Sequence, residues 1–585
     1  MSKMTSRHLR RRLLATTAAT ALLAAGVLVG TAGTANAAAK TGGTLYFITH
    51  AEQFEQLDPA RMYTGRDIAF FNSFLHRNLV SYKPVPGAAG SSLVGDLATN
   101  TGVPSNAAKT WTFTLRPGIT WEDGSAITCA DVKYGVSRPF ATDVITDGPT
   151  YLVNSLDIPL NADGTSKYAG PYKKTGQELY DKAVICKGST ITFKLNRSFA
   201  DFNYALTYPA GAPVKQSKDT GDKYTLAPVS SGPYKVESYK IGDELVMVRN
   251  TAWKKSSDPV RTPYADNIVV RFGLAEDVRD SIMLDDSIPN TVNLDGLMPA
   301  NNRLFFDDPK KANQRMNVYD PYVRYGAMNV SAGHMDCLDI RKAVFFGVNT
   351  QALIDLSGGS VYYGDPGDSP VKPVLGLDYK PTTGNIHDPA WKITGNPDKA
   401  KALLASAKTA CPAAYDRATN PAKGIIWDIS NTATNKKASV LIQTAMTAAG
   451  INMKFNFIPS GQYYATVQDN AKQNDISSVG WGADWANAST VIPELFIKGH
   501  GFALSQNWND PVYPAFEKKS NAALNETNRA KQAKMWQELA QVVMDQYWII
   551  RPVFSKGQFD WGSQVGGVYY WEPQGTYGFG QLYVK

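Results

Sequence analysis

The sequence predicts an α/β protein built from several parts, and three observations support this fold class. The chain has 585 residues, about three or four times the length of a typical domain. Its first half contains short segments with the period-2 alternation of strands. Its second half contains longer amphipathic patterns, one of which leads through a glycine into a strand pattern. The hydrophobic fraction of 43% is ordinary for a globular protein and excludes a mostly disordered chain.

The first residues have the pattern of an export signal, which we place at 1–37. Five basic residues stand in the first 12 positions, an apolar stretch follows over 13–29, and Ala35-Asn36-Ala37 is typical of a cleavage site. We expect cleavage after Ala37, giving a secreted or periplasmic protein; an uncleaved membrane anchor is the alternative. Arg11-Arg12 leaves open whether the general or the twin-arginine route exports the chain. Because no Cys stands near the cleavage point, we expect no lipoprotein anchor.

The charge balance argues against a nucleic-acid-binding protein. The formal net charge is +8, from 60 basic and 52 acidic residues. Without the five basic residues of the signal, 55 basic residues face 52 acidic ones, a balance of +3. A nearly neutral chain of this length has no basic surface of the kind that nucleic acids require, so we expect no nucleic-acid partner.

Strand patterns dominate the first half. Apolar and polar residues alternate strictly at 111–115 and at 191–195, and the first mature segment, 44–48, has a similar pattern. Two further strands are expected at 245–248 and 268–272. Turn signals stand at Asp123-Gly124 and at Ser231-Gly232-Pro233, which separate these segments.

The second half is richer in helix patterns. Asn396-Pro397-Asp398 has the composition of a helix start, with Pro in the tolerated first turn. The segment 436–449 places its apolar residues on one face and stops at Gly450. A strand is expected directly after it, at 451–455. A further apolar stripe runs through the segment 536–543.

Four cysteines, at positions 129, 186, 337 and 411, lie too far apart for a zinc site. An even number in an exported chain suggests two disulfides, and three pairings are possible. We favour the local pairing of Cys129 with Cys186 and of Cys337 with Cys411, because each pair then stays within one lobe. Four free buried thiols are the alternative.

Signatures of common enzyme classes are missing from the sequence. The six histidines are scattered, and none forms the H-E-x-x-H pattern of a zinc protease. There is no G-x-S-x-G nucleophile turn, no phosphate-binding G-x-x-x-x-G-K-[ST] loop and no G-x-G-x-x-G after a strand. We therefore predict a protein that is not an enzyme, with no catalytic residues, no cofactor and no metal. A pair of catalytic carboxylates that meet only in space stays possible.

An ordered set of short motifs resembles a known family. These are Leu-Asp-Pro at 57–59, Trp-Thr-Phe-Thr-Leu-Arg-Pro-Gly at 111–118, Trp-Glu-Asp-Gly at 121–124, Ser-Gly-Pro-Tyr-Lys at 231–235, Asp-Ile-Arg-Lys-Ala-Val at 339–344, Ala-Ala-Gly-Ile at 448–451, Gly-Trp-Gly-Ala-Asp-Trp at 480–485 and the helix around 535–543. Each motif is short, but their order spans nearly the whole mature chain. Together they resemble the extracytoplasmic solute-binding proteins of family 5, which serve peptide and nickel ABC importers.

The resemblance implies the large, three-domain variant of the type II periplasmic-binding-protein clamshell. Carried onto this chain, the first lobe takes 38–71, 222–297 and 556–585, with an extra domain at 72–221, and the second lobe takes 298–555. Two crossings between the lobes make a hinge, and a ligand that contacts both lobes favours the closed form.

The resemblance also implies a binding site in the segment 480–485. Family members that bind peptides hold them extended along strand edges, and a buried carboxylate meets the α-ammonium group. The matching acid here is Asp484. The small residues before it, Gly480, Gly482 and Ala483, would let a ligand backbone approach closely. Further residues of the expected site are the cleft walls Trp481 and Trp485 and the side-chain pocket residue Tyr463, with 52–56 supplying the opposite edge.

One departure from the family pattern concerns the ligand termini. Many members follow the acid with a second Asp-Pro, whereas this chain has Ala486-Asn487-Ala488-Ser489. A dipeptide would need a cation for its carboxylate, and Arg324 and Arg341 are among several candidates between which the sequence does not choose.

We therefore predict a monomeric substrate-binding protein that captures oligopeptides and delivers them to an importer's permease and ATPase. An oligosaccharide or a metal chelate bound by the same fold is one alternative, since the 12 Trp, 29 Tyr and 23 Phe residues would suit sugar stacking. An exported hydrolase on an unrecognised fold is another. Ligand length and side-chain preference stay open.

Overall fold

The computed structural model describes residues 39–332, 335–459, 462–500 and 503–585. The predicted export signal at 1–37 lies outside the described residues. Residues 41–585 form one compact unit. Among its described helices none is both long enough and apolar enough to cross a membrane.

A five-stranded sheet is built from distant segments in the order β11-β1-β10-β9-β8. Its strands are β1 (Thr44–Ile48), β8 (Tyr234–Lys240), β9 (Glu244–Arg249), β10 (Asn267–Arg271) and β11 (Thr291–Asn293). Strand β1 runs parallel to both β10 and β11, whereas β9 is antiparallel to β8 and β10. The strands expected near 44–48, 245–248 and 268–272 are confirmed.

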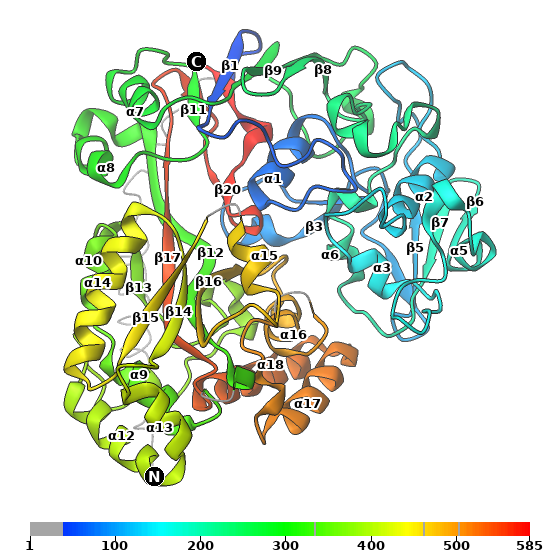
Figure 1. The fold of residues 1–585 in the computed structure, drawn as a ribbon. Helices are drawn as coiled ribbons and strands as arrows, with labels where there is room; N and C mark the ends of the chain where they lie inside the picture. The colour runs from blue at the N-terminus through cyan, green and yellow to red at the C-terminus, as the bar shows by residue number, and fades with distance from the viewer. Residues whose placement is uncertain (1–38, 333–334, 460–461, 501–502) are drawn as a thin grey trace, which may run out of the picture. The chain divides into compact units, whose positions relative to one another are not determined.

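An antiparallel four-stranded sheet, β4-β5-β7-β6, comes from the segment between β1 and β8. It contains β4 (Val103–Ser105), β5 (Thr110–Thr114), β6 (Val184–Lys187) and β7 (Thr190–Lys194). The alternation of the sequence places Trp111 and Phe113 of β5, with Ile191 and Phe193 of β7, in the core. This sheet is surrounded by helices α2 (Cys129–Ser137), α3 (Tyr151–Ser155), α4 (Gly170–Lys173), α5 (Gln177–Ala183) and α6 (Phe202–Ala205) (Figure 1).

A six-stranded sheet of the second half has the order β13-β17-β12-β16-β14-β15. Its strands are β12 (Arg315–Met328), β13 (Gly364–Pro366), β14 (Ile425–Ser430), β15 (Met453–Ile458), β16 (Ile476–Gly482) and β17 (Ile549–Asp560). The predicted strand at 451–455 begins later, at Met453, because Gly450 ends the preceding helix with a φ of +79° and the amide of Ile451 still donates to the carbonyl of Met446.

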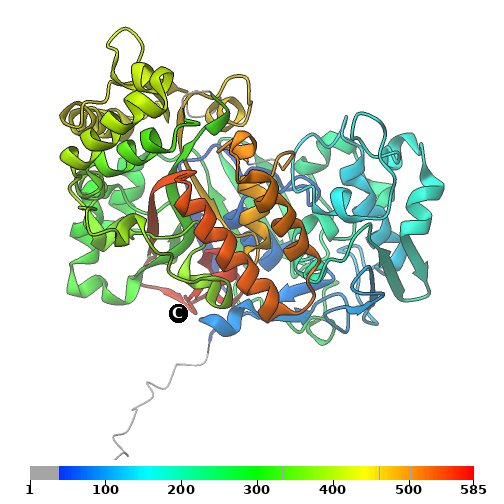
Figure 2. The same ribbon diagram turned by 90° about the horizontal axis from the view of Figure 1, so that it is seen from below.

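Helices cover both faces of this sheet (Figure 1, Figure 2). Core residues of α9 (Leu338–Gly347), α12 (Pro397–Ala410) and α14 (Ala433–Ala448) pack together with Trp427 and Ile476 on one face. Trp536 and Leu539 of α18 (Arg529–Asp545) pack with Val323 and Ile549 on the other. The helix start predicted at Asn396-Pro397-Asp398 and the helices predicted around 436–449 and 536–543 are confirmed. The remaining helices of this half are α10 (Thr350–Leu356), α11 (Gly359–Tyr362), α13 (Pro412–Thr419), α15 (Tyr463–Val467), α16 (Ile492–Phe496) and α17 (Tyr513–Asn525).

The two longest strands, β12 and β17, connect the regions of the first and last sheets. They pair along their length, from Arg315 opposite Asp560 to Ala327 opposite Ile549. Trp561, directly after β17, forms a bridge to Val292 of β11. In Figure 1 the pair runs from the six-stranded sheet toward β11. The remaining described α-helices and strands are three helices and three short strand pairs. The helices are α1 (Gly65–Phe74), α7 (Glu276–Asp285) and α8 (Pro299–Phe306). The strand pairs are β2 (Val80–Tyr82) with β3 (Leu93–Gly95), β18 (Val565–Gly566) with β21 (Tyr583–Val584), and β19 (Tyr570–Trp571) with β20 (Thr576–Tyr577).

Both predicted disulfides are confirmed. Cys129 bonds to Cys186, with 5.8 Å between the Cα atoms, and so ties α2 to β6. Cys337 bonds to Cys411 with a Cα separation of 6.1 Å, joining the start of α9 to the end of α12. The alternative of four free thiols is wrong.

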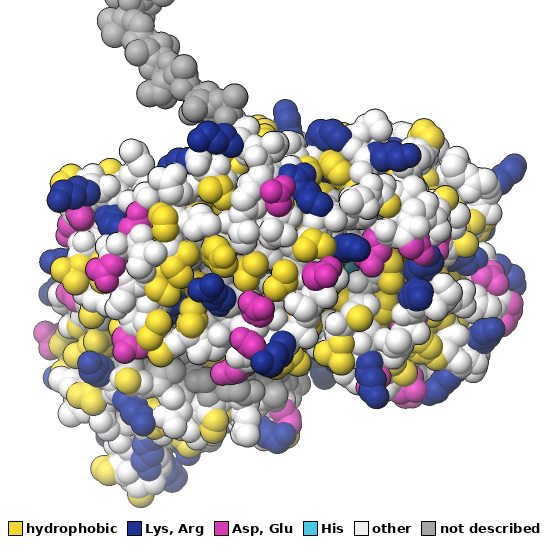
Figure 3. Space-filling view, turned by 90° about the horizontal axis from the view of Figure 1, so that it is seen from above, with side chains coloured by type: hydrophobic (Ala, Val, Ile, Leu, Met, Phe, Trp, Pro, Cys, Tyr) yellow, Lys and Arg dark blue, Asp and Glu magenta, His cyan; other side chains and the backbone are white. Residues whose placement is uncertain are grey.

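On the surface shown in Figure 3, side chains of both charge signs are interspersed with uncharged ones.

Candidate functional site

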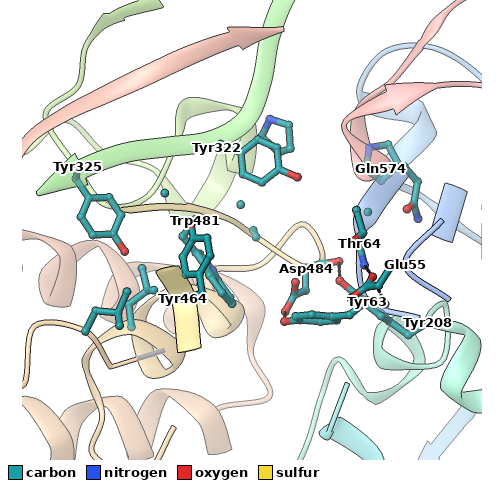
Figure 4. Close-up of a pocket in the computed structure, with 18 of the residues that line it drawn as sticks. Glu55, Tyr63, Thr64, Tyr208, Tyr322, Tyr325, Tyr464, Trp481, Asp484 and Gln574 are labelled. Carbon is teal, nitrogen blue, oxygen red and sulfur yellow. Dashed lines mark hydrogen bonds between the residues drawn. The ribbon is translucent and has the colours of Figure 1, made fainter. Parts of the chain in front are cut away.

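A cavity of about 580 Å³ lies at the carboxyl end of β16. Five consecutive residues of the predicted segment line it: Gly480, Trp481, Gly482, Ala483 and Asp484. The remaining lining comes from other segments, most of them far away in the sequence, and includes Glu55, Tyr63, Thr64, Tyr208, Tyr322, Tyr325, Tyr464 and Gln574 (Figure 4). The sequence motif and the cavity therefore coincide.

The two glycines of β16 make room for side chains of the neighbouring strand. Gly482 is paired with Tyr322 and Gly480 with Arg324 of β12. A Cβ atom on Gly482 would lie 2.9 Å from the ring of Tyr322, and one on Gly480 would lie 3.0 Å from Nη1 of Arg324. The small residues thus serve the packing of β12 across β16, a role that the sequence did not indicate.

The carboxylate of Asp484 lies among tyrosine hydroxyls. The hydroxyl of Tyr63 donates to Oδ2 at 3.2 Å, and the hydroxyl of Tyr151 donates to the same oxygen. The backbone amide of Asp484 donates to Oγ1 of Thr490 at 3.1 Å, which fixes the loop after β16. The described residues that line the cavity include no Lys, Arg or His.

Burial raises the pKa of Asp484 to about 7, and the charge of Glu494 adds to this shift. The hydrogen bonds from the tyrosine hydroxyls oppose it, because they stabilise the ionised form. A cationic group placed beside this carboxylate would lower its pKa again. The site is therefore suited to an ammonium group, which the described lining residues do not supply.

Six of the described residues that line the cavity are aromatic. Tyr325, Tyr464 and Trp481 stand on one side of Asp484, and Tyr63 and Tyr208 stand on the other (Figure 4). The indole Nε1 of Trp481 donates to the carbonyl of Thr490 at 2.7 Å, so the ring orientation is fixed by the protein. Such rings offer apolar surface with a polar edge, as ligand clefts often do.

The segment 52–56 contributes Glu55 to the opposite wall. Its Oε2 accepts hydrogen bonds from the amides of Tyr63 at 3.2 Å and Thr64 at 2.6 Å, just before α1. Glu52 lies away from the cavity, with its carboxylate near Gly242 and Gly273. Of the segment 52–56, which was expected to form the opposite edge of the site, only Glu55 is among the described residues that line the cavity.

Trp485 is not among the described residues that line the cavity of about 580 Å³, which is called the main cavity from here on. Its side chain is 2% exposed and packs against Tyr151, with ring centroids 4.9 Å apart, and against Phe199 at 6.1 Å. It borders a different cavity of about 290 Å³, which also includes Tyr63 and Arg197. Trp485 thus belongs to a core that is formed mostly by the first half of the chain and partly by its last residues, such as Trp561 and Phe579.

Tyr463 also lies outside the main cavity. Its side chain is buried, and its hydroxyl donates to the backbone carbonyls of Asp428 at 3.1 Å and Ser478 at 2.7 Å. The next residue, Tyr464, lines the cavity in its place. The two tyrosines begin α15, where consecutive side chains point in different directions, so a shift of one residue exchanges a structural ring for a cavity wall.

The two candidate cations differ in their partners. Arg341 is buried and forms an ion pair with Asp510 at 3.0 Å, and its other nitrogens donate to backbone carbonyls. Arg324 extends over Gly480 and lines a smaller cavity beside the main one. Within the described parts of the chain there is no cluster of three or more His, Cys, Asp or Glu side chains with metal-binding geometry.

Sequence reasoning missed most of the tyrosines around Asp484. Tyr63, Tyr151 and Tyr208 stand at the start of α1, in α3 and after α6, and no local pattern marks them. Tyr322 and Tyr325 belong to the long strand β12, whose pairing with β16 is a tertiary contact. A signal for these residues would have required knowing that β12 neighbours β16.

Comparison with known proteins gives consistent matches. The glutathione-binding protein GsiB of Salmonella typhi is 23% identical over 465 residues, covering 75% of this chain and 76% of that protein. The dipeptide-binding protein of Escherichia coli K12 is 22% identical over 508 residues, covering 82% and 83%.

Among solved structures, the clavulanic acid biosynthesis oligopeptide binding protein 2 has 28% identity and a TM-score of 0.82, covering 93% of this chain and 96% of that one. The Helicobacter pylori binding protein DppA, solved with the peptide STSA, has 17% identity and a TM-score of 0.69, covering 93% and 98%. These matches confirm the predicted fold class. The model of the bacterial extracellular solute-binding proteins, family 5 Middle, matches residues 92–502, and the chain therefore belongs to the family 5 solute-binding proteins.

Proposed function

We propose that this protein captures oligopeptides outside the cytoplasm and delivers them to the permease and ATPase of an ABC importer. Relatives of known name bind glutathione or dipeptides, and one structural match holds a peptide. Family membership supports a solute-binding role, and the residues that line the cavity indicate the kind of solute.

The observation that carries the proposal is the carboxylate of Asp484. It lies in a cavity whose described lining contains no cationic side chain, and only tyrosine hydroxyls reach it. A peptide brings the missing group, because its α-ammonium is a cation at neutral pH. A charge-assisted hydrogen bond of this kind contributes about 1.5–3 kcal/mol to binding.

The strand β16 offers a place for the ligand backbone. Its pairing with β14 covers only Ile476 and Ser477, so the stretch that ends in Gly482 continues along the cavity beyond its neighbour. A peptide that pairs with a strand uses main-chain hydrogen bonds, which do not depend on the peptide sequence. This mode suits a protein that accepts many oligopeptides.

The lobes, the mature form and the partners belong to the same proposal. The first lobe is 38–71 with 222–297 and 556–585, the extra domain is 72–221, and the second lobe is 298–555. The strands β12 and β17 support this division, since they run between the regions of the two large sheets. The mature chain acts as a monomer after cleavage of the signal.

Isothermal titration calorimetry with a library of short peptides tests the proposal. We expect binding to peptides with a free amino terminus, and a loss of about ten- to a hundredfold in affinity for N-acetylated versions. Binding of cello- or chito-oligomers in place of peptides would refute it in favour of a sugar ligand. Hydrolysis of generic peptide or ester substrates would refute it in favour of an enzyme.

A further inference from the structure

The loop that follows β16 contacts a segment far away in the sequence through buried side chains. The side-chain amide of Asn487 donates to Oδ2 of Asp201 at 2.6 Å, and the hydroxyl of Ser489 donates to the same oxygen at 3.3 Å. All three side chains are buried. Asp201 belongs to 72–221, the proposed extra domain, whereas Asn487 belongs to 298–555, the proposed second lobe. A buried contact between two parts of a hinged protein forms when these parts close on each other.

Asn487 uses its whole side chain in this arrangement. Its amide nitrogen also donates to Oε1 of Gln532 at 2.9 Å, and its Oδ1 accepts from the backbone amide of Ser489 at 2.8 Å. An aspartate at this position would have no donor, and its carboxylate would meet that of Asp201. The departure of the segment 486–489 from the Asp-Pro pattern of many family members thus has a physical reason in this chain.

Asp201 is available for the contact because its side chain does not cap the next helix. The residue directly precedes α6 but forms no capping hydrogen bond with the described residues of that helix. Its charge is attracted by Arg529, whose guanidinium forms an ion pair with Asp378. Burial raises the pKa of Asp201, whereas the charge of Arg529 and the hydrogen bond from Ser489 oppose this shift. The ionised carboxylate is therefore stabilised by groups of the other part of the chain.

A path of hydrogen bonds connects this contact with Asp484. The hydroxyl of Thr490 donates to the carbonyl of Asn487 at 3.1 Å and accepts from the backbone amide of Asp484 at 3.1 Å. Within the same loop, the amide of Ala488 donates to Oδ2 of Asp378 at 2.7 Å. The loop is therefore held from two sides, and a displacement of Asn487 is transmitted to the backbone of Asp484.

The carboxylate of Asp484 has partners from other parts of the chain as well. It accepts hydrogen bonds from the hydroxyls of Tyr63, in the proposed first lobe, and Tyr151, in the proposed extra domain. These bonds and the bond between Asp201 and Asn487 are made by the chain itself. They can therefore hold the closed arrangement before a ligand arrives.

We propose that Asp201 is a positioning residue for Asp484, which acts through Asn487 to hold the loop 484–490 and the closed arrangement of the lobes. This inference rests on the proposed function and on its division into lobes. The contact lowers the free energy of the closed form, so a larger fraction of the protein is ready to bind. The apparent affinity for the peptide rises with that fraction.

A set of variants that breaks and restores the contact tests the inference. The proteins are wild type, Asp201→Ala, Asp201→Asn, Asn487→Asp and the double variant Asp201→Asn with Asn487→Asp. The double variant exchanges the donor and the acceptor, so it restores a bond that Asn487→Asp replaces by two facing carboxylates. The controls Asp163→Asn and Asn431→Asp make the same changes at exposed positions of the same two segments.

Two measurements are made on each protein. Small-angle X-ray scattering without ligand gives the radius of gyration, which increases when the lobes open. Calorimetry with alanine peptides of two to five residues, each with a free and with an N-acetylated amino terminus, gives the affinity and the preference for the free terminus. Thermal midpoints are recorded in parallel. A role in folding alone would lower the midpoint but leave the radius and this preference unchanged.

We expect Asp201→Ala and Asn487→Asp to have a larger radius of gyration than wild type. Their affinity for peptides with a free amino terminus should fall by about ten- to a hundredfold, and the preference over acetylated peptides should narrow. The double variant should recover much of both losses, and Asp201→Asn should have a mild effect because its amide oxygen still accepts from Asn487. Since Asn487→Asp can fail to fold, Asp201→Ala is the second test of the same contact.

Equal radii of gyration in wild type and in the two disruptive variants would overturn the inference. A double variant no better than Asn487→Asp would overturn it as well, and so would peptide binding with an unchanged preference for the free amino terminus in Asp201→Ala. If no peptide binds to wild type, the proposed function fails, and the scattering of the ligand-free proteins then shows separately whether Asp201 and Asn487 hold the lobes together.

Discussion

Asp484 and Trp485 are neighbours in the chain but belong to different parts of the molecule. The carboxylate of Asp484 lines the main cavity and carries a raised pKa. The ring of Trp485 is packed against Tyr151 and Phe199 in a core made mostly by the first half of the chain. Between two consecutive residues, the sequence passes from a side chain that lines the cavity to one that is packed in the core.

The residues after Trp485 continue the structural role. The side-chain amide of Asn487 donates to Asp201 at 2.6 Å and to Gln532 at 2.9 Å, and all three side chains are buried. The loop is therefore anchored on one side so that Asp484 is held in place on the other. The comparison teaches that a short motif can combine an acid that lines a cavity with the contacts that position it.

Replacement of Trp485 by alanine gives the largest expected effect. It removes a buried aromatic side chain from the core, and such changes cost about 3–5 kcal/mol of unfolding free energy. Chemical denaturation with a two-state or domain-resolved fit measures this. A loss below about 1 kcal/mol would mean that Trp485 is a cleft wall, as the sequence predicts, and would remove the contrast with Asp484.

Replacement of Asp484 by asparagine should weaken peptide binding without lowering the stability of the fold. We expect peptide affinity to fall by about 1.5–3 kcal/mol, because the ammonium group loses its counter-charge. The free energy of unfolding should not fall, because no described cation lines the cavity and because burial, which raises the pKa of Asp484 to about 7, disfavours its ionised form. Asp398→Asn, on the exposed start of α12, is the matched control that removes a carboxylate elsewhere. Equal losses of affinity in both variants would refute a specific role for Asp484.

The pH dependence of peptide affinity distinguishes the cavity around Asp484 from the core around Trp485. Because the pKa of Asp484 is raised to about 7, its carboxyl group is largely protonated below that pH and binds an ammonium less well. Affinity should therefore fall by up to about tenfold per unit as the pH drops below 7. It should fall again above about 8, where the peptide's amino group loses its proton. A flat profile between pH 5.5 and 7.5 would contradict the ammonium contact.

The ligand-free protein should show the reverse trend in stability. A carboxyl group whose folded pKa lies above its ordinary value of 3.8 binds more protons in the folded state, so stability falls as the pH rises from about 4 to 7. Asp560, whose pKa burial also raises to about 7, contributes in the same direction from outside the cavity. Thermal midpoints at a series of pH values should show a shallower fall in Asp484→Asn than in wild type.

The pair Tyr463 and Tyr464 gives the smallest expected effects. Tyr463→Phe removes hydrogen bonds to two buried carbonyls and should cost about 1 kcal/mol of stability without changing affinity. Tyr464→Ala removes a cavity wall and should weaken peptide binding by about 0.5–1.5 kcal/mol with little change in stability. Exchanged outcomes would restore Tyr463 as the ligand-facing residue.

Much of the fold could be predicted from the sequence because its signals are local. The strict alternation at 111–115 places Trp111 and Phe113 inward, and the stop at Gly450 ends the helix where expected. The even number of cysteines left three disulfide pairings open, and the local pairing was predicted because each pair then stays within one lobe. The motif at 480–485 located the cavity because five of its six residues line it.

The rest of the site depends on contacts between distant segments. Tyr63 and Tyr151 meet Asp484 across more than 300 positions of the sequence, and no pattern around either tyrosine indicates it. The contact of Asn487 with Asp201 likewise joins segments that no local pattern connects. The register of α15, which decides between Tyr463 and Tyr464, is set by tertiary packing as well.

Proton release on peptide binding tests the central claim most directly. Calorimetry at pH 6.5, in buffers with different ionisation enthalpies, counts the protons exchanged while the peptide's amino group stays protonated. Because the pKa of Asp484 is raised to about 7 in the free protein, an ammonium beside it should expel roughly half a proton or more in wild type and almost none in Asp484→Asn. Equal release in both proteins, or none in either, would contradict the contact between Asp484 and the amino terminus of the ligand.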